Sequence, residues 1–300
     1  MTKIVFFNHY HRGDLFTSKE YVRQIMRNYP GFEYEYWHYN HPKIVRDLGI
    51  TTYLIPEQID RNSQFVKIDN TTYAVNTWWD VFEKHGGVNM LTLNESWQNI
   101  FNLLNLYCNT KLLVSEAQDY IPTVDYSCFN VSPVDKFVMN NRKRALFCNG
   151  VPMSSQSFFG DMSDVINEFA FQHPHVDFIC TKRIESKEPN VYFTDDITET
   201  SEEYPVNVPW NDRETTGCDL NEISYLSTKC DLIVGKNSGP FVFCETKDNF
   251  MDENKHIISF SKGSRESMSY EMLLKCKYQL ITDHKPDTIK SVLGQALATL

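Results

Sequence analysis

The pattern of apolar and polar positions alternates between short strands and helices along the first 55 residues. Apolar runs predict strands at 3–9, 32–39 and 51–55, and helical spacing predicts helices at 18–29 and 42–48. Turn residues close both helices, the first at Pro30-Gly31 and the second at Gly49. Strand–helix–strand alternation of this kind is typical of a parallel sheet with crossover helices.

The middle of the chain interrupts this alternation, which then restarts. A strand at 73–76 and helices near 78–84 and 96–107 are followed by 120–142, a stretch with two prolines and no helical period. The later pattern predicts strands at 144–149, 176–180, 191–193, 230–234, 256–260 and 279–282, and helices at 161–172, 221–228, 239–245 and from Pro286. A polar loop is expected at 195–217. We therefore expect two α/β domains, 1–125 and 143–300, joined by a linker at 126–142, with a ligand cleft at the carboxyl ends of the strands.

Composition narrows the class of partner and compartment. The 300 residues suit about two domains of ~150 residues. The formal net charge of −10 favours small-molecule or neutral partners over nucleic acid, although a local basic patch is compatible with this net charge. None of the eight cysteines forms a CxxC pair, and several lie in apolar runs, as buried free thiols in a reducing cytosol do. Neither a signal peptide nor an apolar run of ~20 residues is recognisable. We expect a cytoplasmic protein without a transmembrane segment.

The segment NHYHRGD, residues 8–14, follows the first predicted strand and lies where the cleft is expected. Its Arg-Gly-Asp triplet reads as a chance match, because the sequence shows no export signal. The pair His9 and His11 lacks the third protein ligand that catalytic zinc usually has. Asp14 is either a cap of the following helix or a general base, and the residues alone favour the cap.

A second candidate site is Gly235–Gly239, GKNSG, between a buried strand and a helix. Glycines let backbone N–H groups approach a ligand, a helix N-terminus favours an anion, and Lys236 adds positive charge. Asn237 and Ser238 complete the turn. The alternative is an ordinary strand–turn–helix corner with Ser238 as its cap, and the residues alone leave phosphate binding and this alternative about equally supported.

Four further residues are candidates of lower specificity. Lys182 follows a strand and is either a phosphate contact or a surface charge, and Glu222 either reaches a ribose hydroxyl or is a surface residue. Asn76 and Trp78 belong to YAVNTWW, whose aromatic residues either stack on a sugar or pack in the core.

Two stretches together resemble the ADP-heptose:LPS heptosyltransferase-like family of GT-B glycosyltransferases. They are GDLFTSKEYVRQIMRNYPG, residues 13–31, and LNEISYLSTKCDLIVGKNSGPF, residues 220–241. The resemblance implies an α/β fold of two facing Rossmann-like domains, with the nucleotide-sugar donor mainly on the second and the acceptor on the first. It also implies an inverting, metal-independent transfer without a cofactor, in which Asp14 is the base and Asn237, Ser238 and Gly239 hold the donor phosphates.

The chain departs from the family in three places. Pro240, Phe241 and Val242 stand where the family usually has a histidine after the turn, Lys236 replaces a small or polar residue, and YAVNTWW has no counterpart. The sugar and the acceptor therefore stay open.

The resulting expectation is a glycosyltransferase that moves a sugar from a nucleotide sugar to a hydroxyl of a glycan or another acceptor. Lys236 or Lys182 would stabilise the departing nucleotide diphosphate. Gly13, His11, Arg12, Asn76 and Trp78 would lie on the acceptor side. Three alternatives are a sugar-nucleotide epimerase or hydrolase, a non-catalytic nucleotide-sugar-binding protein, and a transferase acting on nucleic acid, which the acidic charge disfavours. No DXD-like metal site stands out, since Asp195-Asp196 is a lone pair in a predicted loop.

Overall fold

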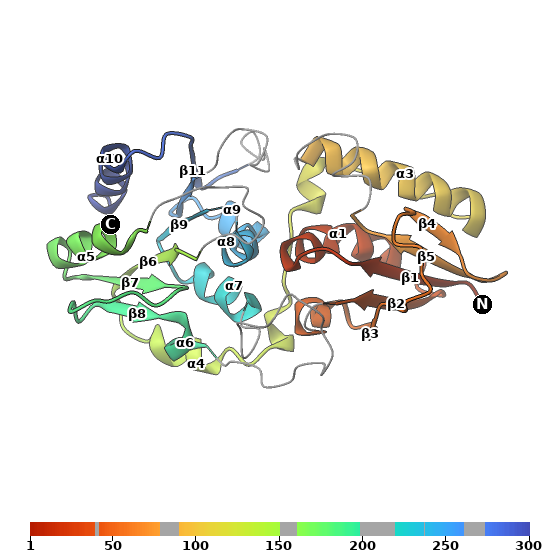
Figure 1. Cartoon of the computed structure of the whole chain (residues 1–300), viewed down its shortest axis with the longest axis horizontal. Coiled ribbons are helices and arrows are strands. Elements are labelled where there is room, and N and C mark those ends of the chain that lie inside the picture. The colour runs from red at the N-terminus through yellow and green to blue at the C-terminus, as the bar shows by residue number, and fades with distance from the viewer. Residues whose placement is uncertain (40–41, 79–89, 151–160, 199–219, 237, 261–273) are drawn as a thin grey trace. The chain divides into compact units, whose positions relative to one another are not determined.

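The computed structural model of the chain describes all residues except 40–41, 79–89, 151–160, 199–219, 237 and 261–273. Among the described residues, Met1–Thr123 form one compact unit and those from Val124 onward form another. Each unit has one sheet with helices packed on it (Figure 1). The helix expected at 78–84 and most of the loop expected at 195–217 lie outside the described residues.

The first unit contains a five-stranded sheet in the order β3-β2-β1-β5-β4. Neighbouring strands are parallel except β4, which pairs antiparallel with β5 at the edge. The strands are β1 (Lys3–Asn8), β2 (Glu33–His38), β3 (Thr51–Leu54), β4 (Phe65–Lys67) and β5 (Thr72–Asn76). The helical segments are α1 (Arg12–Asn28), α3 (Met90–Cys108) and the 3₁₀ turns η1 (Pro42–Leu48) and η2 (Ala117–Tyr120).

The second unit contains a six-stranded, fully parallel sheet in the order β11-β10-β9-β6-β7-β8. The strands are β6 (Lys143–Cys148), β7 (Val176–Cys180), β8 (Val191–Phe193), β9 (Leu232–Lys236), β10 (His256–Phe260) and β11 (Lys277–Ile281). The helical segments are η3 (Tyr126–Cys128), α4 (Ser132–Phe137), α5 (Ser163–Gln172), α6 (Thr194–Ile197), α7 (Leu220–Thr228), α8 (Gly239–Cys244), α9 (Lys247–Phe250) and α10 (Pro286–Leu297).

Alternating strand residues build the core of the second unit. The residues that face α5 and α10, such as Phe147, Phe178 and Val234, share one buried cluster with Ile166 and Leu293 of those helices. Figure 1 shows α5 and α10 together on one side of the sheet and α7 and α8 on the other. Burial on both faces explains why these strands are continuous apolar runs in the sequence.

The strand order places a topological switch point in each sheet. In the first unit the chain moves outward from β1 to β2 and β3 and then returns to β5 on the other side of β1. In the second unit it moves from β6 to β7 and β8 and then returns to β9. Open α/β sheets bind ligands at the carboxyl ends of strands beside such switch points. Candidate ligand sites therefore lie at the corners after β1 and β5 in the first unit and after β6 and β9 in the second.

Three expectations from the sequence differ from the fold. Helix α1 begins at Arg12 instead of residue 18, because its first turn is polar and does not show the apolar period. The stretch 126–142, expected as a linker, contains η3 and α4 and belongs to the second unit. The edge strand β4 was not expected, since it has only three residues.

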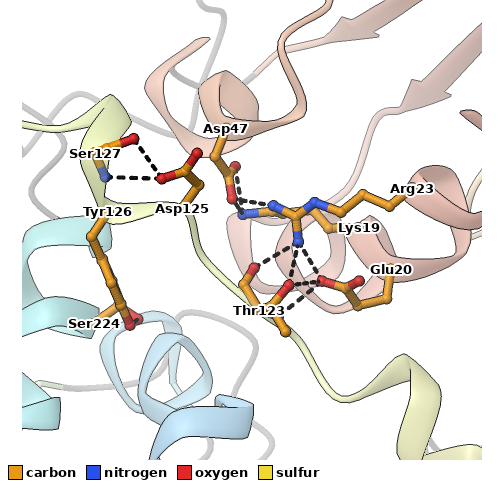
Figure 2. A network of polar contacts seen from close by, with 9 residues as sticks. All are labelled: Lys19, Glu20, Arg23, Asp47, Thr123, Asp125, Tyr126, Ser127 and Ser224. Carbon is orange, nitrogen blue, oxygen red and sulfur yellow. Dashed lines mark hydrogen bonds and ion pairs between the residues drawn. The ribbon is translucent and has the colours of Figure 1, made fainter. Parts of the chain in front are cut away.

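A buried network of charges holds α1 in place within the first unit (Figure 2). Lys19 and Asp47 are fully buried, and their charged groups lie 2.7 Å apart. Arg23 pairs with both Glu20 and Asp47. Glu20 Oε1 accepts the backbone N–H of Thr123 at 2.9 Å, and Arg23 Nη1 donates to the Thr123 carbonyl at 2.7 Å. The last residue of the first unit is thus fixed to the helix that carries Asp14.

The chain is also fixed soon after it enters the second unit. The hydroxyls of Tyr126 and Ser224 lie 3.0 Å apart, which attaches η3 to α7 (Figure 2). Asp125 Oδ1 accepts the backbone N–H of Ser127 at 3.1 Å and closes this turn. Helix α7 is the element that carries Glu222.

Candidate functional site

Asp14 lies in the first turn of α1, beside the carboxyl end of β1. Its Oδ2 accepts the backbone N–H of His11 at 2.9 Å, and only 17% of its side chain is exposed. Burial raises the pKa of Asp14 to about 7, although the hydrogen bond from His11 opposes this shift. A carboxyl with a pKa near neutrality is suited to take up and release a proton at physiological pH.

The residues that precede Asp14 form the entry to the helix. His11 is the N-cap residue, its Nδ1 lies 3.9 Å from Asp14 Oδ2, and 45% of its side chain is exposed. Burial lowers the pKa of His11, so this imidazole is neutral at pH 7. Arg12 and Gly13 are half-buried first residues of α1. The carboxyl of Asp14 is therefore not held in its charged form by a strong ion pair with His11.

Asn76 and Trp78 are inside the protein. Asn76 is fully buried, and its side chain donates to the Arg61 carbonyl at 3.2 Å and accepts the Trp78 N–H at 3.1 Å. Trp78 is 2% exposed. The Asn76 side chain thus holds the segments at the end of β5, and neither side chain is exposed to an acceptor. The core-packing interpretation of Trp78 is the one that the structure favours.

Gly235 is required for packing inside the second unit. A Cβ atom at this position would lie 2.8 Å from Phe241 Cγ and 2.9 Å from Cys148 Cβ, closer than real Cβ contacts come. The absence of a Cβ at Gly235 therefore lets α8 pack closely against β9. At Gly239, by contrast, an added Cβ would meet no atom within 4 Å. The space beside this glycine is therefore open to a ligand.

Two lysines and an aspartate gather at the carboxyl ends of β7 and β9. Lys236, the last residue of β9, is 2% exposed. Its pKa is lowered by burial, raised in part by the charge of Asp161 and lowered again by the charge of Lys182. Lys182 is exposed, and Asn149 fixes its backbone by two hydrogen bonds of 2.8 and 2.9 Å. The cluster offers two cations to an anion at the switch point.

Ser238 brings a hydroxyl to the same corner. It is the N-cap residue of α8, as the alternative interpretation expected, and its carbonyl accepts the N–H of Val242 at 2.9 Å, but its side chain makes no capping hydrogen bond. Its Oγ is buried, with no hydrogen-bond partner among the described residues. A buried hydroxyl without a partner is costly, and a ligand that bonds to it would remove the cost. Asn237 lies outside the described residues.

Glu222 is fully buried in the first turn of α7. The surface interpretation of this residue is therefore wrong. Its burial suits either a ligand contact or a structural group within the second unit.

Asp161 and Glu245 are titratable residues that the sequence did not single out. Asp161 lies before α5, where it accepts the N–H of Ser163 at 2.9 Å, and a lone acidic residue before a helix gives no signal beyond capping. Burial raises the pKa of Glu245 to about 8, and Tyr278 donates a hydrogen bond to it at 3.2 Å. Its position after an apolar stretch gave no hint that it is buried.

Neither a metal site nor a membrane-spanning helix is found among the residues that the structure describes. In the part of the chain that the structure describes, no three histidine, cysteine, aspartate or glutamate residues are grouped so that they could hold a metal ion. Within the same residues, no helix has both the length and the apolar character needed to cross a membrane.

Comparison with solved structures identifies the fold. No protein-family profile and no curated protein matches the sequence. A glycosyltransferase of family 9 from Veillonella parvula is similar over 100% of this chain and 93% of its own, with 9% identity and a TM-score of 0.53. The ADP-heptose LPS heptosyltransferase II of E. coli is similar over 100% and 99%, with 11% identity and a TM-score of 0.50. The chain has the α/β fold of these glycosyltransferases, the GT-B type with two Rossmann-like sheets.

Proposed function

We propose that the protein is a glycosyltransferase that moves a sugar from a nucleotide-sugar donor to a hydroxyl of an acceptor. The observation that carries this proposal is Asp14, a largely buried carboxyl with a pKa of about 7 at the switch point of the first sheet. The GT-B fold supports the same class, because the two similar structures described above are glycosyltransferases.

Asp14 is the proposed general base. In its ionised form it takes the proton of the acceptor hydroxyl while the oxygen attacks the anomeric carbon of the donor sugar. General base catalysis of this kind contributes typically ~10²–10⁴-fold to a rate. His11, Arg12 and Gly13 surround this carboxyl in the chain and are the proposed acceptor-side residues.

The second unit supplies the proposed donor site. As the bond from the anomeric carbon to the diphosphate breaks, the electron pair goes to the departing phosphate oxygen. Lys236 and Lys182 stabilise that charge, and Ser238 Oγ donates a hydrogen bond to it. Asn237 and Gly239 are proposed phosphate contacts on the same turn, and Glu222 a ribose contact. Gly235 is retained only as the packing residue that shapes the turn.

The transfer is proposed to invert the anomeric configuration. A single displacement by the acceptor oxygen enters opposite the leaving group, and inversion follows from that geometry. The two lysines provide positive charge of the kind that a metal ion supplies in other transferases, so we propose a metal-independent reaction.

The experiment is thermal unfolding of the protein in the presence of a panel of nucleotide sugars and nucleoside diphosphates. A ligand that binds only the folded state stabilises it, by about 2.7 kcal/mol at a concentration of 100 Kd. A shift with one nucleotide sugar that is reduced in Ser238→Ala supports the donor site. No shift with any member of the panel at millimolar concentration contradicts it. Consumption of the donor without an acceptor indicates the epimerase or hydrolase alternative instead.

A further inference from the structure

The hydroxyl of Thr77 lies at the centre of a buried group of polar side chains beneath Asp14. Thr77 follows β5 and is fully buried. Its Oγ1 lies 3.0 Å from Asn8 Nδ2, 3.4 Å from Ser18 Oγ and 3.2 Å from the Tyr36 hydroxyl. These residues come from β1, α1 and β2, so the hydroxyl of Thr77, just after β5, connects two strands with the helix that carries Asp14.

Thr77 Oγ1 accepts hydrogen bonds from two sides. Asn8 Oδ1 accepts the backbone N–H of Tyr10 at 2.9 Å, so the other end of this amide is its NH₂ group, which donates to Thr77. The Ser18 hydroxyl is the donor in its contact with Thr77 and also lies 2.9 Å from the Asp14 carbonyl, which can only accept.

In the contact between Thr77 and Tyr36, either hydroxyl can be the donor. Burial raises the pKa of Tyr36 to about 12, so the phenol keeps its proton throughout the physiological range. The Thr77 hydroxyl thus joins side chains of β1, β2 and α1, and Ser18 continues this network to the Asp14 carbonyl. Hydrogen bonds in a buried network strengthen one another.

We propose that Thr77 is a positioning residue for Asp14, because its hydroxyl joins β1 and β2 to Ser18, whose hydroxyl also reaches the Asp14 carbonyl. This network fixes the first turn of α1, in which Asp14 and Leu15 donate their N–H groups to the His11 carbonyl at 3.2 and 3.4 Å. The inference rests on the proposed function in so far as Asp14 is the base. The placement of the turn can be measured without any substrate.

The experiment compares Thr77→Val, which keeps the shape and removes the hydroxyl, with Thr77→Ser, which restores it. Amide hydrogen exchange of His11, Asp14 and Leu15 is followed by NMR in the ligand-free protein. We expect exchange about tenfold faster in Thr77→Val and near wild type in Thr77→Ser. The matched control is Thr110→Val, a buried threonine of the same unit that donates to Asn105 at 2.7 Å and should leave these amides unchanged.

Turnover supplies the second readout. A displaced base lowers kcat by about 10–100-fold, while donor affinity, which depends on the second unit, stays the same. Unchanged exchange in folded Thr77→Val overturns the inference, and so does faster exchange with an unaltered kcat. If wild type turns over no donor while exchange responds as expected, the proposed function fails and the positioning of the turn stands.

Should Thr77→Val fail to fold, Tyr36→Phe is measured in the same way. It removes only the hydroxyl that joins β2 to Thr77, and we expect exchange about threefold faster at the same three amides. Unchanged exchange in this variant overturns the inference.

Discussion

Asp14 accepts the backbone N–H of His11 at 2.9 Å, while burial raises the pKa of its carboxyl to about 7. The two facts have opposite consequences for stability. A capping carboxylate stabilises its helix, whereas a carboxyl whose pKa is raised on folding costs stability once it is ionised. If capping outweighs the cost of ionisation, Asp14 stabilises the protein, as a structural aspartate does. If the cost of ionisation is larger, Asp14 lowers stability above pH 7, as we expect for the proposed base.

We predict that Asp14→Asn stabilises the protein above pH 7 and abolishes turnover. The folded pKa lies above the unfolded value of 3.8, so stability falls as the pH rises from about 4 to about 7 and stays reduced above that. Asparagine removes this cost, which is at most about 4 kcal/mol for a pKa raised from 3.8 to about 7. Urea unfolding at pH 5 and pH 8 measures it, and a loss of about 1 kcal/mol at both pH values would identify a cap.

The matched control for Asp14→Asn is Glu245→Gln. Burial raises the pKa of Glu245 to about 8, so the amide should also stabilise the protein at high pH. Because this carboxyl is outside the proposed base and donor sites, Glu245→Gln should leave kcat unchanged. An equal loss of turnover in both variants would contradict the proposal that Asp14 is the general base.

Lys236→Met tests the proposed donor site. Methionine fills a similar volume, so the buried position tolerates it, and the loss of a charge-assisted contact to phosphate should weaken nucleoside diphosphate binding by about 10–100-fold. Isothermal titration calorimetry measures this effect once the thermal panel has identified a ligand. Lys290→Met, at an exposed lysine on α10, is the control, and equal affinities in the two variants would contradict the site.

The two glycines of the turn should respond differently to alanine. Gly235→Ala forces a Cβ against Phe241 and Cys148, and overpacking of this kind typically costs about 1–3 kcal/mol. Gly239→Ala meets no atom within 4 Å, so its stability should change by less than about 1 kcal/mol while donor affinity falls. Chemical unfolding measures the stability of both variants, and titration with the donor measures their affinity. A stability loss in Gly239→Ala as large as in Gly235→Ala would contradict the assignment of packing to Gly235 and ligand contact to Gly239.

The buried network of Figure 2 makes a prediction about α1. Asp47→Asn leaves Lys19 and Arg23 without their shared carboxylate, and removing one partner of a buried pair typically costs about 3–5 kcal/mol. Glu168→Gln, which breaks the exposed pair with Lys290, should cost about 1 kcal/mol or less. Comparable values for the two variants in urea unfolding would show that the network contributes little.

The strands were predictable where burial on both faces makes them apolar throughout. The expected strands at 176–180 and 256–260 coincide with β7 and β10. The start of α1 was missed because its first turn carries the polar residues of the site. The antiparallel strand β4 was missed because three residues show no period.

The sequence singled out candidate residues, but it could not give their surroundings in the fold. Polar segments after apolar strands pointed to Asp14 and to the turn at 235–239 as candidates. The packing role of Gly235 and the burial of Glu222 depend on segments that meet only in the folded chain. The same is true of Thr77, whose three partners are separated from it by 41 to 69 residues.

The most direct measurement is release of nucleoside diphosphate from the nucleotide sugar that the thermal panel selects, with and without an acceptor-containing glycan extract. We expect release that depends on the extract, is accompanied by a glycosylated product and is lost in Asp14→Asn. Release that is equally fast without the extract, or that persists in Asp14→Asn, would contradict this expectation.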